Sequence, residues 1–343
     1  MTTEPVQSES ELDALLSSPS PRLIDTMRRL EGDIMILGVA GKMGVTLAMA
    51  AKRAIDSAGV RKQVTGVSRF SDPKTRASLE EAGIATIACD LIDRDAVSRL
   101  PHTQNVVFMA GRKFGTQGDE GLTWSSNVLI PANVGEHFST SRIVAFSTGC
   151  VYPLASPESG GCTEDDPPAP IGEYSQSCLG RERVFDYYSK HKGTPVCLLR
   201  LNYAIDLRYG VLHDIGQQIV KGRPIDVSMG YFNCIWQGDA NSQALLALEH
   251  CDSPAKILNI TGPETIAVRS MAQELASELG TKSTFTGEES STAYLNNAAK
   301  AHRLFGAPSV SLAQMVEWTA HWIKMGGSSL GRSTHFEVRD GNF

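Results

Sequence analysis

One short segment constrains the fold of this chain more than any other: DIMILGVAGKMGVTLAMAAKRAID, residues 33–56. Its apolar start predicts a strand over residues 33–38, and the apolar spacing that follows predicts a helix. Gly38, Gly41 and Gly44 lie between the two. Glycines here allow a tight turn, the close approach of a pyrophosphate and close helix–strand packing, and the helix start offers N–H groups to phosphate. The segment therefore predicts a dinucleotide-binding loop; a plain glycine-rich turn is the alternative.

The rest of the first 200 residues alternates short β-branched runs with longer helical patterns such as residues 122–138. Further strands are predicted at residues 63–68, 84–88, 105–110, 142–147 and 195–200. Strand–helix alternation predicts an α/β fold with a doubly wound parallel sheet and right-handed crossovers. Beyond residue 200 the pattern is irregular, with a strand at 257–262 and helices at 240–250, 268–279 and 311–325. We expect this region to form a smaller lid over the carboxyl edge of the sheet.

Composition excludes several classes of protein. A net charge of −6 argues against a nucleic-acid or anionic-membrane partner, since either requires a basic face. The seven cysteines are scattered without a CxxC pair and there is no HExxH, so neither a metal site nor a disulfide framework is expected. The N-terminus lacks the features of a signal peptide, and no stretch reaches the ~20 apolar residues that cross a bilayer. Reduced thiols favour a cytoplasmic protein.

The end of the second predicted strand indicates which dinucleotide is preferred. A protein selective for NAD places Asp or Glu there, where the carboxylate bonds the ribose 2′-hydroxyl. This sequence has Ser68 and Arg69 instead. A hydroxyl and a guanidinium bind a 2′-phosphate, which a carboxylate would repel. We therefore predict a preference for NADP(H), with NAD(H) as the second possibility; Arg69 as an ordinary surface charge is the alternative.

Five further motifs lie in order along the chain: CDLID, FMAGRKFG, SSNV, FSTGCVY and GEYSQSCLGRER. Together with the glycine loop and the segments at 257–280 and 296–323, they resemble the extended short-chain dehydrogenase/reductase family. This family includes the NAD-dependent sugar epimerases and dehydratases. The resemblance extends from about residue 33 to about residue 325.

The resemblance implies a Rossmann-type domain with a defined set of cofactor contacts. These would be Gly38, Gly41, Lys42, Met43, Gly44, Ser68, Arg69, Asp90, Leu91, Ala110, Gly111, Lys113 and Asn127. We expect an NAD(P)-binding Rossmann domain over residues 32–200 and a mainly substrate-binding domain over 201–343, some segments of which return to the Rossmann core. Residues 1–31 form a helical N-terminal extension, with capping signals at Ser8–Glu11 and Ser20–Pro21.

The resemblance also implies the catalytic residues. Tyr174 would transfer the proton at the substrate oxygen and Thr148 would orient that oxygen. The family's lysine four residues after the tyrosine is replaced by Cys178, which cannot supply the positive charge that lowers the pKa of a phenol. Lys113 is the first candidate for that charge and Arg181 the second, although Arg181 is expected to fall short. Cys178 itself is either a thiolate nucleophile or, as we favour, a buried thiol that packs the helix.

Members of the family that bind nucleotide sugars carry an arginine that holds the diphosphate. In the corresponding segment YFNCIWQGDAN, Phe232 takes the place of that arginine. We therefore expect a smaller sugar or sugar-acid substrate. The candidate substrate contacts are Asn202, Tyr203, Arg208, His213 and Trp236. The polar tail STHFEVRDGNF would cover either the active site or a partner subunit.

Two hypotheses follow. The first is an NAD(P)-dependent oxidoreductase or epimerase/dehydratase, and the retained pair of Thr148 and Tyr174 favours it. The second is a non-catalytic NADP(H)-binding redox sensor or scaffold in which the missing lysine marks lost chemistry. A homodimer is expected because members of the resembled family commonly pair two long helices from each subunit.

Overall fold

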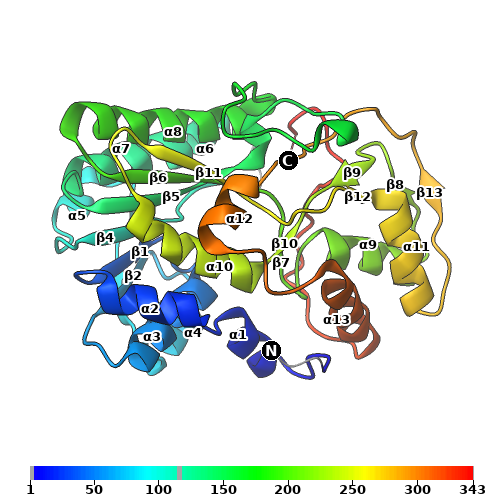
Figure 1. The fold of residues 1–343 in the computed structure, drawn as a ribbon, viewed down its shortest axis with the longest axis horizontal. Helices are drawn as coiled ribbons and strands as arrows, with labels where there is room; N and C mark the ends of the chain where they lie inside the picture. The colour runs from blue at the N-terminus through cyan, green and yellow to red at the C-terminus, as the bar shows by residue number, and fades with distance from the viewer. Residues whose placement is uncertain (1–3, 114–117, 343) are drawn as a thin grey trace.

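A seven-stranded parallel sheet forms the centre of the protein in the computed structural model, which describes residues 4–113 and 118–342 (Figure 1). The strand order is β11-β6-β5-β4-β1-β2-β3. The strands are β1 (Ile34–Leu37), β2 (Val64–Ser68), β3 (Ala85–Ala88), β4 (Asn105–Phe108), β5 (Arg142–Thr148), β6 (Val196–Leu201) and β11 (Lys256–Ile260). The order reverses between β1 and β4, which is where doubly wound sheets bind ligands at their carboxyl edge. The predicted fold class is confirmed.

Helices cover both faces of the sheet because the strands are apolar on both sides, as parallel strands require. One face is covered by α2 (Pro21–Arg29), α3 (Gly44–Ala58), α4 (Pro73–Glu81), α10 (Gln237–Leu246) and α12 (Ala299–Phe305). The other face is covered by α5 (Arg94–Ser98), α6 (Glu120–Trp124), α7 (Ile130–His137) and α8 (Gly172–Lys192). The helix α8 carries Tyr174 and ends at Gly193, whose φ of 71° suits the left-handed C-terminal position.

The predicted helix over residues 122–138 is interrupted. A π-helical turn, Ser125–Leu129, separates α6 from α7. Pro131 lacks the N–H that would bond the carbonyl of Asn127, which favours a change of hydrogen-bonding pattern here. The interruption fixes Asn127 at a buried position where its side chain bonds the backbone of Arg112.

A second region of the chain forms the lid, which lies to the right of the sheet in Figure 1. It contains α9 (Val211–Val220), α11 (Val268–Glu278), α13 (Leu312–Lys324) and the strand pairs β7–β10 (Ala204–Ile205, Ile235–Trp236), β8–β13 (Ile225–Asp226, Phe285–Thr286) and β9–β12 (Tyr231–Phe232, Ile266–Ala267). Trp236, Trp318 and Phe232 are buried in its separate core. The chain returns from the lid to the sheet as β11, beside β6. The division into domains stays a prediction.

The N-terminal helices are capped as their sequence indicates. The Ser8 side chain accepts a hydrogen bond from the N–H of Glu11 at the start of α1 (Glu9–Leu16), and Ser20 accepts one from the N–H of Leu23 at the start of α2. The buried residues of α1 join the lid core and those of α2 join the sheet core. The extension therefore packs against both regions.

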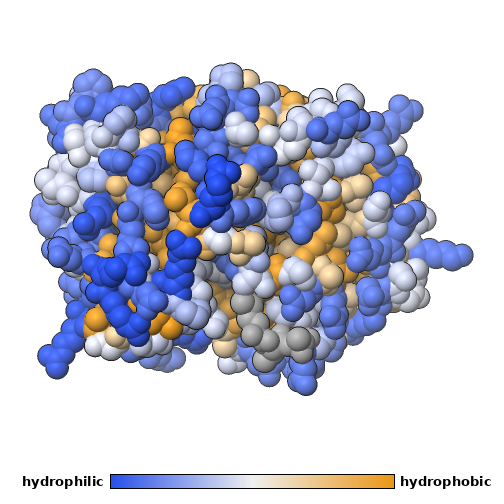
Figure 2. Space-filling model, in the orientation of Figure 1, coloured by the Kyte–Doolittle hydropathy of each residue, from blue (hydrophilic) through white to orange (hydrophobic). Residues whose placement is uncertain are grey.

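The surface is mainly hydrophilic on the face shown in Figure 2, as expected for a chain in which hydrophobic residues make up 41%. Figure 2 shows one face covered mainly by hydrophilic residues, with apolar residues visible in scattered groups. Across residues 4–113 and 118–342, no helix combines the length and the apolar character that crossing a membrane requires.

Candidate active site

The glycine loop between β1 and α3 is built by backbone contacts that exclude a side chain. Gly38 has a φ of +89°, and a Cβ there would lie 2.7 Å from the backbone nitrogen of Ala110. A Cβ on Gly44 would lie 2.3 Å from the carbonyl oxygen of Val39, so this glycine permits the close packing of α3 on β1. A Cβ on Gly41 would meet, within 4 Å, just the carbonyl oxygen of Gly38. Gly38 and Gly44 are therefore packed against protein backbone, whereas the space beside Gly41 is free for a ligand.

Two cavities meet at this loop, and both are lined by Gly38, Gly41 and Met109. The outer cavity lies at the carboxyl ends of β2, β3 and β4. It contains the predicted contacts Ser68, Arg69, Asp90, Leu91, Ala110 and Gly111. An extended dinucleotide would lie across the glycine loop and the N-terminus of α3, with one end in each cavity. The cofactor assignments themselves stay predictions.

The inner cavity brings the predicted catalytic pair to the glycine loop. Of the predicted residues, it contains Lys42, Met43, Gly44, Lys113, Thr148, Tyr174, Asn202 and Tyr203. The sequence analysis did not identify its other lining residues, which are Met109, Phe146, Ser147, Cys150, Leu201, Ala204, Tyr209, Gly210 and Thr334. Several of these residues are sequence neighbours of predicted ones, such as Ser147 beside Thr148 and Ala204 beside Tyr203. Their position at strand ends could have identified them as lining residues. Thr334 lies in the C-terminal tail and had no such signal.

Asn127 lies behind the cavity and is not one of the residues that line it. Its Oδ1 accepts hydrogen bonds from the backbone N–H of Arg112 at 2.9 Å and from Nη2 of Arg181 at 2.6 Å. Its Nδ2 donates to the Ser177 hydroxyl at 2.9 Å. Asn127 therefore supports the backbone that follows β4, and its direct contact with a cofactor stays a prediction.

Tyr174 is held as a neutral phenol. Burial raises its pKa well above the usual value of 10, and the neighbouring thiols of Cys178 and Cys150 raise it further. The Arg181 guanidinium and a hydrogen bond with Thr148 lower this pKa without reversing the effect of burial. Arg181 lies close enough to act on the phenol electrostatically, and its Nη1 donates to the carbonyl of Phe146 at 2.8 Å. Tyr174 therefore carries its proton at neutral pH.

Cys178 packs the inner side of α8. It is 1% exposed and belongs to an apolar cluster with Val151, Tyr152 and Cys162. Burial raises the pKa of its thiol to about 11. It is absent from the described residues that line the cavity. A neutral, enclosed thiol is not a nucleophile, so these observations favour the packing role over the nucleophile among the two alternatives for Cys178.

Two lysines bring positive charge into the inner cavity. Nζ of Lys113 donates to the carbonyl oxygen of Thr334 at 3.2 Å. Nζ of Lys42 donates to the carbonyl oxygen of Ala204 at 3.0 Å and lies 4.1 Å from the centre of the Tyr209 ring. Burial lowers the pKa of both ammonium groups, that of Lys42 to about 7.

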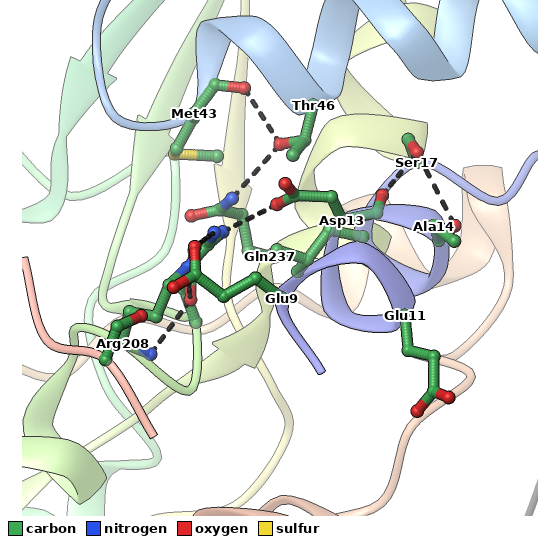
Figure 3. Close-up of polar contacts among 12 residues, drawn as sticks. Glu9, Glu11, Asp13, Ala14, Ser17, Met43, Thr46, Arg208 and Gln237 are labelled. Carbon is green, nitrogen blue, oxygen red and sulfur yellow. Dashed lines mark hydrogen bonds and ion pairs between the residues drawn. The ribbon is translucent and has the colours of Figure 1, made fainter. Parts of the chain in front are cut away.

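Three predicted substrate contacts are not among the described residues that line the cavity. Arg208 instead forms ion pairs with Asp206 at 3.0 Å and with Asp13 of α1 at 2.8 Å (Figure 3). His213 is buried with its Nε2 3.0 Å from the Ser329 hydroxyl. Trp236 packs edge-on against Trp318, with ring centres 5.4 Å apart, inside the lid core. These contacts give the three residues structural roles, and their contacts with a substrate stay predictions.

The C-terminal tail covers the active-site side of the molecule. Thr334 is 1% exposed, and its N–H and hydroxyl donate to the Asp214 carboxylate at 2.7 and 2.6 Å. Farther along, Gly341 packs against Gly172 at the start of α8, so closely that a Cβ on either would touch the other's backbone. Figure 1 shows the C-terminus between the sheet and the lid. The first of the two placements expected for this tail is the observed one.

The fold and the site together define a dinucleotide-binding protein of the extended short-chain dehydrogenase/reductase type. The chain belongs to the NAD dependent epimerase/dehydratase family, whose family model matches residues 34–205. Membership makes it an NAD-dependent enzyme of this type. No protein of curated function matches the sequence.

Solved structures of sugar-nucleotide enzymes share the fold. UDP-glucuronic acid 4-epimerase from Bacillus cereus, in complex with UDP-glucuronic acid and NAD, is 20% identical with a TM-score of 0.69, covering 85% of this chain and 99% of its own. WbmG from Bordetella bronchiseptica, in complex with NAD and UDP, is 20% identical with a TM-score of 0.70, covering 89% and 99%. UDP-glucose 4-epimerase from Thermotoga maritima is 17% identical with a TM-score of 0.70, covering 86% and 99%.

Proposed function

We propose that the protein is an NAD(P)-dependent oxidoreductase or epimerase that acts on a carbonyl or hydroxyl group of a small sugar-like or sugar-acid substrate. Tyr174 is the general acid/base and Thr148 orients the substrate oxygen. The observation that carries the proposal is that both hydroxyls line the cavity that begins at the glycine loop. A dinucleotide on that loop would present its reactive ring to the same cavity.

The state of Tyr174 favours reduction of a carbonyl. A bound nicotinamide supplies or accepts the hydride at the substrate carbon. The neutral phenol of Tyr174 gives its proton to the carbonyl oxygen, so that the carbonyl becomes an alcohol. The reverse reaction requires the phenolate, which the raised pKa disfavours. Thr148, hydrogen-bonded to the phenol, is placed to hold the substrate oxygen beside it.

Several features support a substrate without a nucleotide, in contrast to the UDP-sugar enzymes with the same fold. Phe232, which takes the place of the family's diphosphate-binding arginine, is 1% exposed and buried in the lid core. Thr334 of the tail forms part of the cavity wall. Preference for NADP(H) is supported by the positions of Ser68 and Arg69 in the outer cavity.

We also propose a homodimer in a reducing compartment, the cytoplasm. Large apolar side chains are exposed on the outer faces of the helices that follow β4 and β5: Leu122 at 44%, Leu129 at 54% and Tyr187 at 52%. All seven cysteines are free thiols. Light scattering of the purified protein would give twice the chain mass of 37.0 kDa; a monomer at micromolar concentration would refute the dimer.

Substitution Tyr174→Phe tests the proposed chemistry. The measurement is NADPH oxidation with a panel of small keto and aldehyde sugars, alongside NADPH binding by fluorescence. We expect turnover to fall by about 10²–10⁴-fold with NADPH affinity unchanged, because the phenol acts on the proton and leaves the glycine loop intact. Tyr187→Phe is the control, because it removes a hydroxyl from the exposed face of the same helix and keeps the aromatic ring of the proposed dimer face. Hydride transfer that is undiminished in Tyr174→Phe would refute the role of Tyr174. Hydride transfer that is absent from the wild type with every substrate, while NADPH still binds, would favour the non-catalytic sensor.

A further inference from the structure

Lys42 and Lys113 approach the inner cavity from the sheet side, and carbonyl groups on its far side hold them. Lys42 extends from the glycine loop to Ala204 of β7, and Lys113 extends from the segment after β4 to Thr334 of the tail. Both acceptors belong to the region beyond residue 200. The two hydrogen bonds therefore hold the ammonium groups against the part of the cavity that the region beyond residue 200 forms.

The charge of these lysines is only partly balanced nearby. Of the described residues that line the cavity, none is Asp or Glu. Asp206, just behind it, is paired with Arg208. Asp214 faces both lysines, but its hydrogen bonds are to the neutral donors of Ser333 and Thr334.

Glu337 also acts on Lys113 electrostatically, but it lines a separate surface hollow together with Arg223. Neutral carbonyls are weaker partners for an ammonium than a carboxylate is, because charge-assisted hydrogen bonds are shorter and stronger. The described lining of the cavity contains two lysines and no carboxylate, so the cavity is suited to an anion.

We propose that Lys42 and Lys113 bind the carboxylate of a sugar-acid substrate and so place its reacting carbon beside Tyr174. The inference rests on the proposed function and names its substrate class. The Tyr209 ring, 4.1 Å from Nζ of Lys42, supports that ammonium from the side. One negative charge between the two lysines, with Asp214 behind them, leaves this part of the cavity neutral.

Calorimetric titration of the NADPH-loaded protein with D-gluconate tests this, with D-glucose as the neutral counterpart. We expect gluconate to bind the wild type, and Lys42→Met and Lys113→Met each to weaken it by about tenfold or more. The resemblance places Lys42 and Lys113 among the cofactor contacts, whereas this proposal places both ammonium groups on the substrate, so affinity for NADPH should stay within about threefold. Lys42→Arg should restore gluconate binding, and Lys52→Met, on α3 where Lys52 pairs with Asp56, should behave as wild type.

Four results would overturn the proposal. The first two are unchanged gluconate affinity in both methionine variants, and glucose binding as tightly as gluconate. The other two are lysine-dependent binding of glucose 6-phosphate without binding of gluconate, and a tenfold loss of NADPH affinity in the variants with gluconate affinity unaffected. The last would assign the lysines to the pyrophosphate. Because binding is measured without turnover, undiminished turnover in Tyr174→Phe would refute the proposed function and would leave the outcome of this binding test unaffected. Thermal melting of each variant confirms folding.

Discussion

Replacing Glu182 with glutamine should destabilise the helix that carries Tyr174. Glu182 accepts hydrogen bonds from the Ser147 hydroxyl at 2.6 Å and from Nε and Nη2 of Arg200 at 3.0 and 2.7 Å. The two charged side chains are 3% and 2% exposed. Removing one member of such a pair leaves a buried, uncompensated charge, which costs about 3–5 kcal/mol. Arg200 keeps its contact with the Tyr152 ring, 4.6 Å from its centre, so we expect a loss near 3 kcal/mol.

The expected shift in melting temperature follows from the length of the chain. At ~2.1 cal/mol/K per residue, 343 residues give an unfolding entropy of about 0.7 kcal/mol/K, so the midpoint should fall by about 4 °C. Scanning calorimetry and urea unfolding measure both quantities. Asp186→Asn is the matched control, because its ion pair with Lys190 on the same helix is 25% and 54% exposed and should contribute at most ~0.5 kcal/mol. A loss in Glu182→Gln no larger than in this control would refute the reasoning.

Three further predictions concern the two cavities. Arg69→Glu should shift the preference from NADPH toward NADH by at least about tenfold, because a carboxylate repels the 2′-phosphate; equal ratios of dissociation constants in variant and wild type would contradict the assignment. Cys178→Ala should lower turnover by less than about threefold, since burial keeps its thiol neutral with a pKa of about 11; a hundredfold loss in steady-state rate would restore its catalytic role. Gluconate affinity should fall as pH rises through and above about 7, because burial lowers the pKa of Lys42 to that value and the anion requires the ammonium form; calorimetry at pH 6 and 9 should show a much weaker dependence in Lys42→Arg, and equal dependence in the two would count against Lys42.

Local sequence was sufficient where local backbone geometry dictates the residue. Gly38 and Gly44 were predictable because their conformation and close contacts exclude a side chain. Thr148 and Tyr174 were found through motifs on a strand end and a helix, both of which point to the same carboxyl edge of the sheet. These parts of the fold are set by short-range patterns that a single sequence displays.

The side-chain partners of the other candidate residues come from distant parts of the chain and could not be predicted from local sequence. Arg208 pairs with Asp13, 195 residues earlier, and the partner of His213 is 116 residues later. Thr334 reaches Lys113 across 221 residues from a tail that shows no periodicity. A polar residue in the second half of such a chain serves equally well as a pocket residue or as a structural anchor, and only the tertiary packing separates the two.

A crystal structure of the protein with bound NADPH tests the central claim most directly. The account predicts a dinucleotide that crosses the glycine loop at Gly41, its ribose phosphate beside Arg69 and its nicotinamide ring against the Tyr174 hydroxyl. A nicotinamide ring outside the inner cavity, or a Tyr174 phenol turned away from the ring, would contradict it.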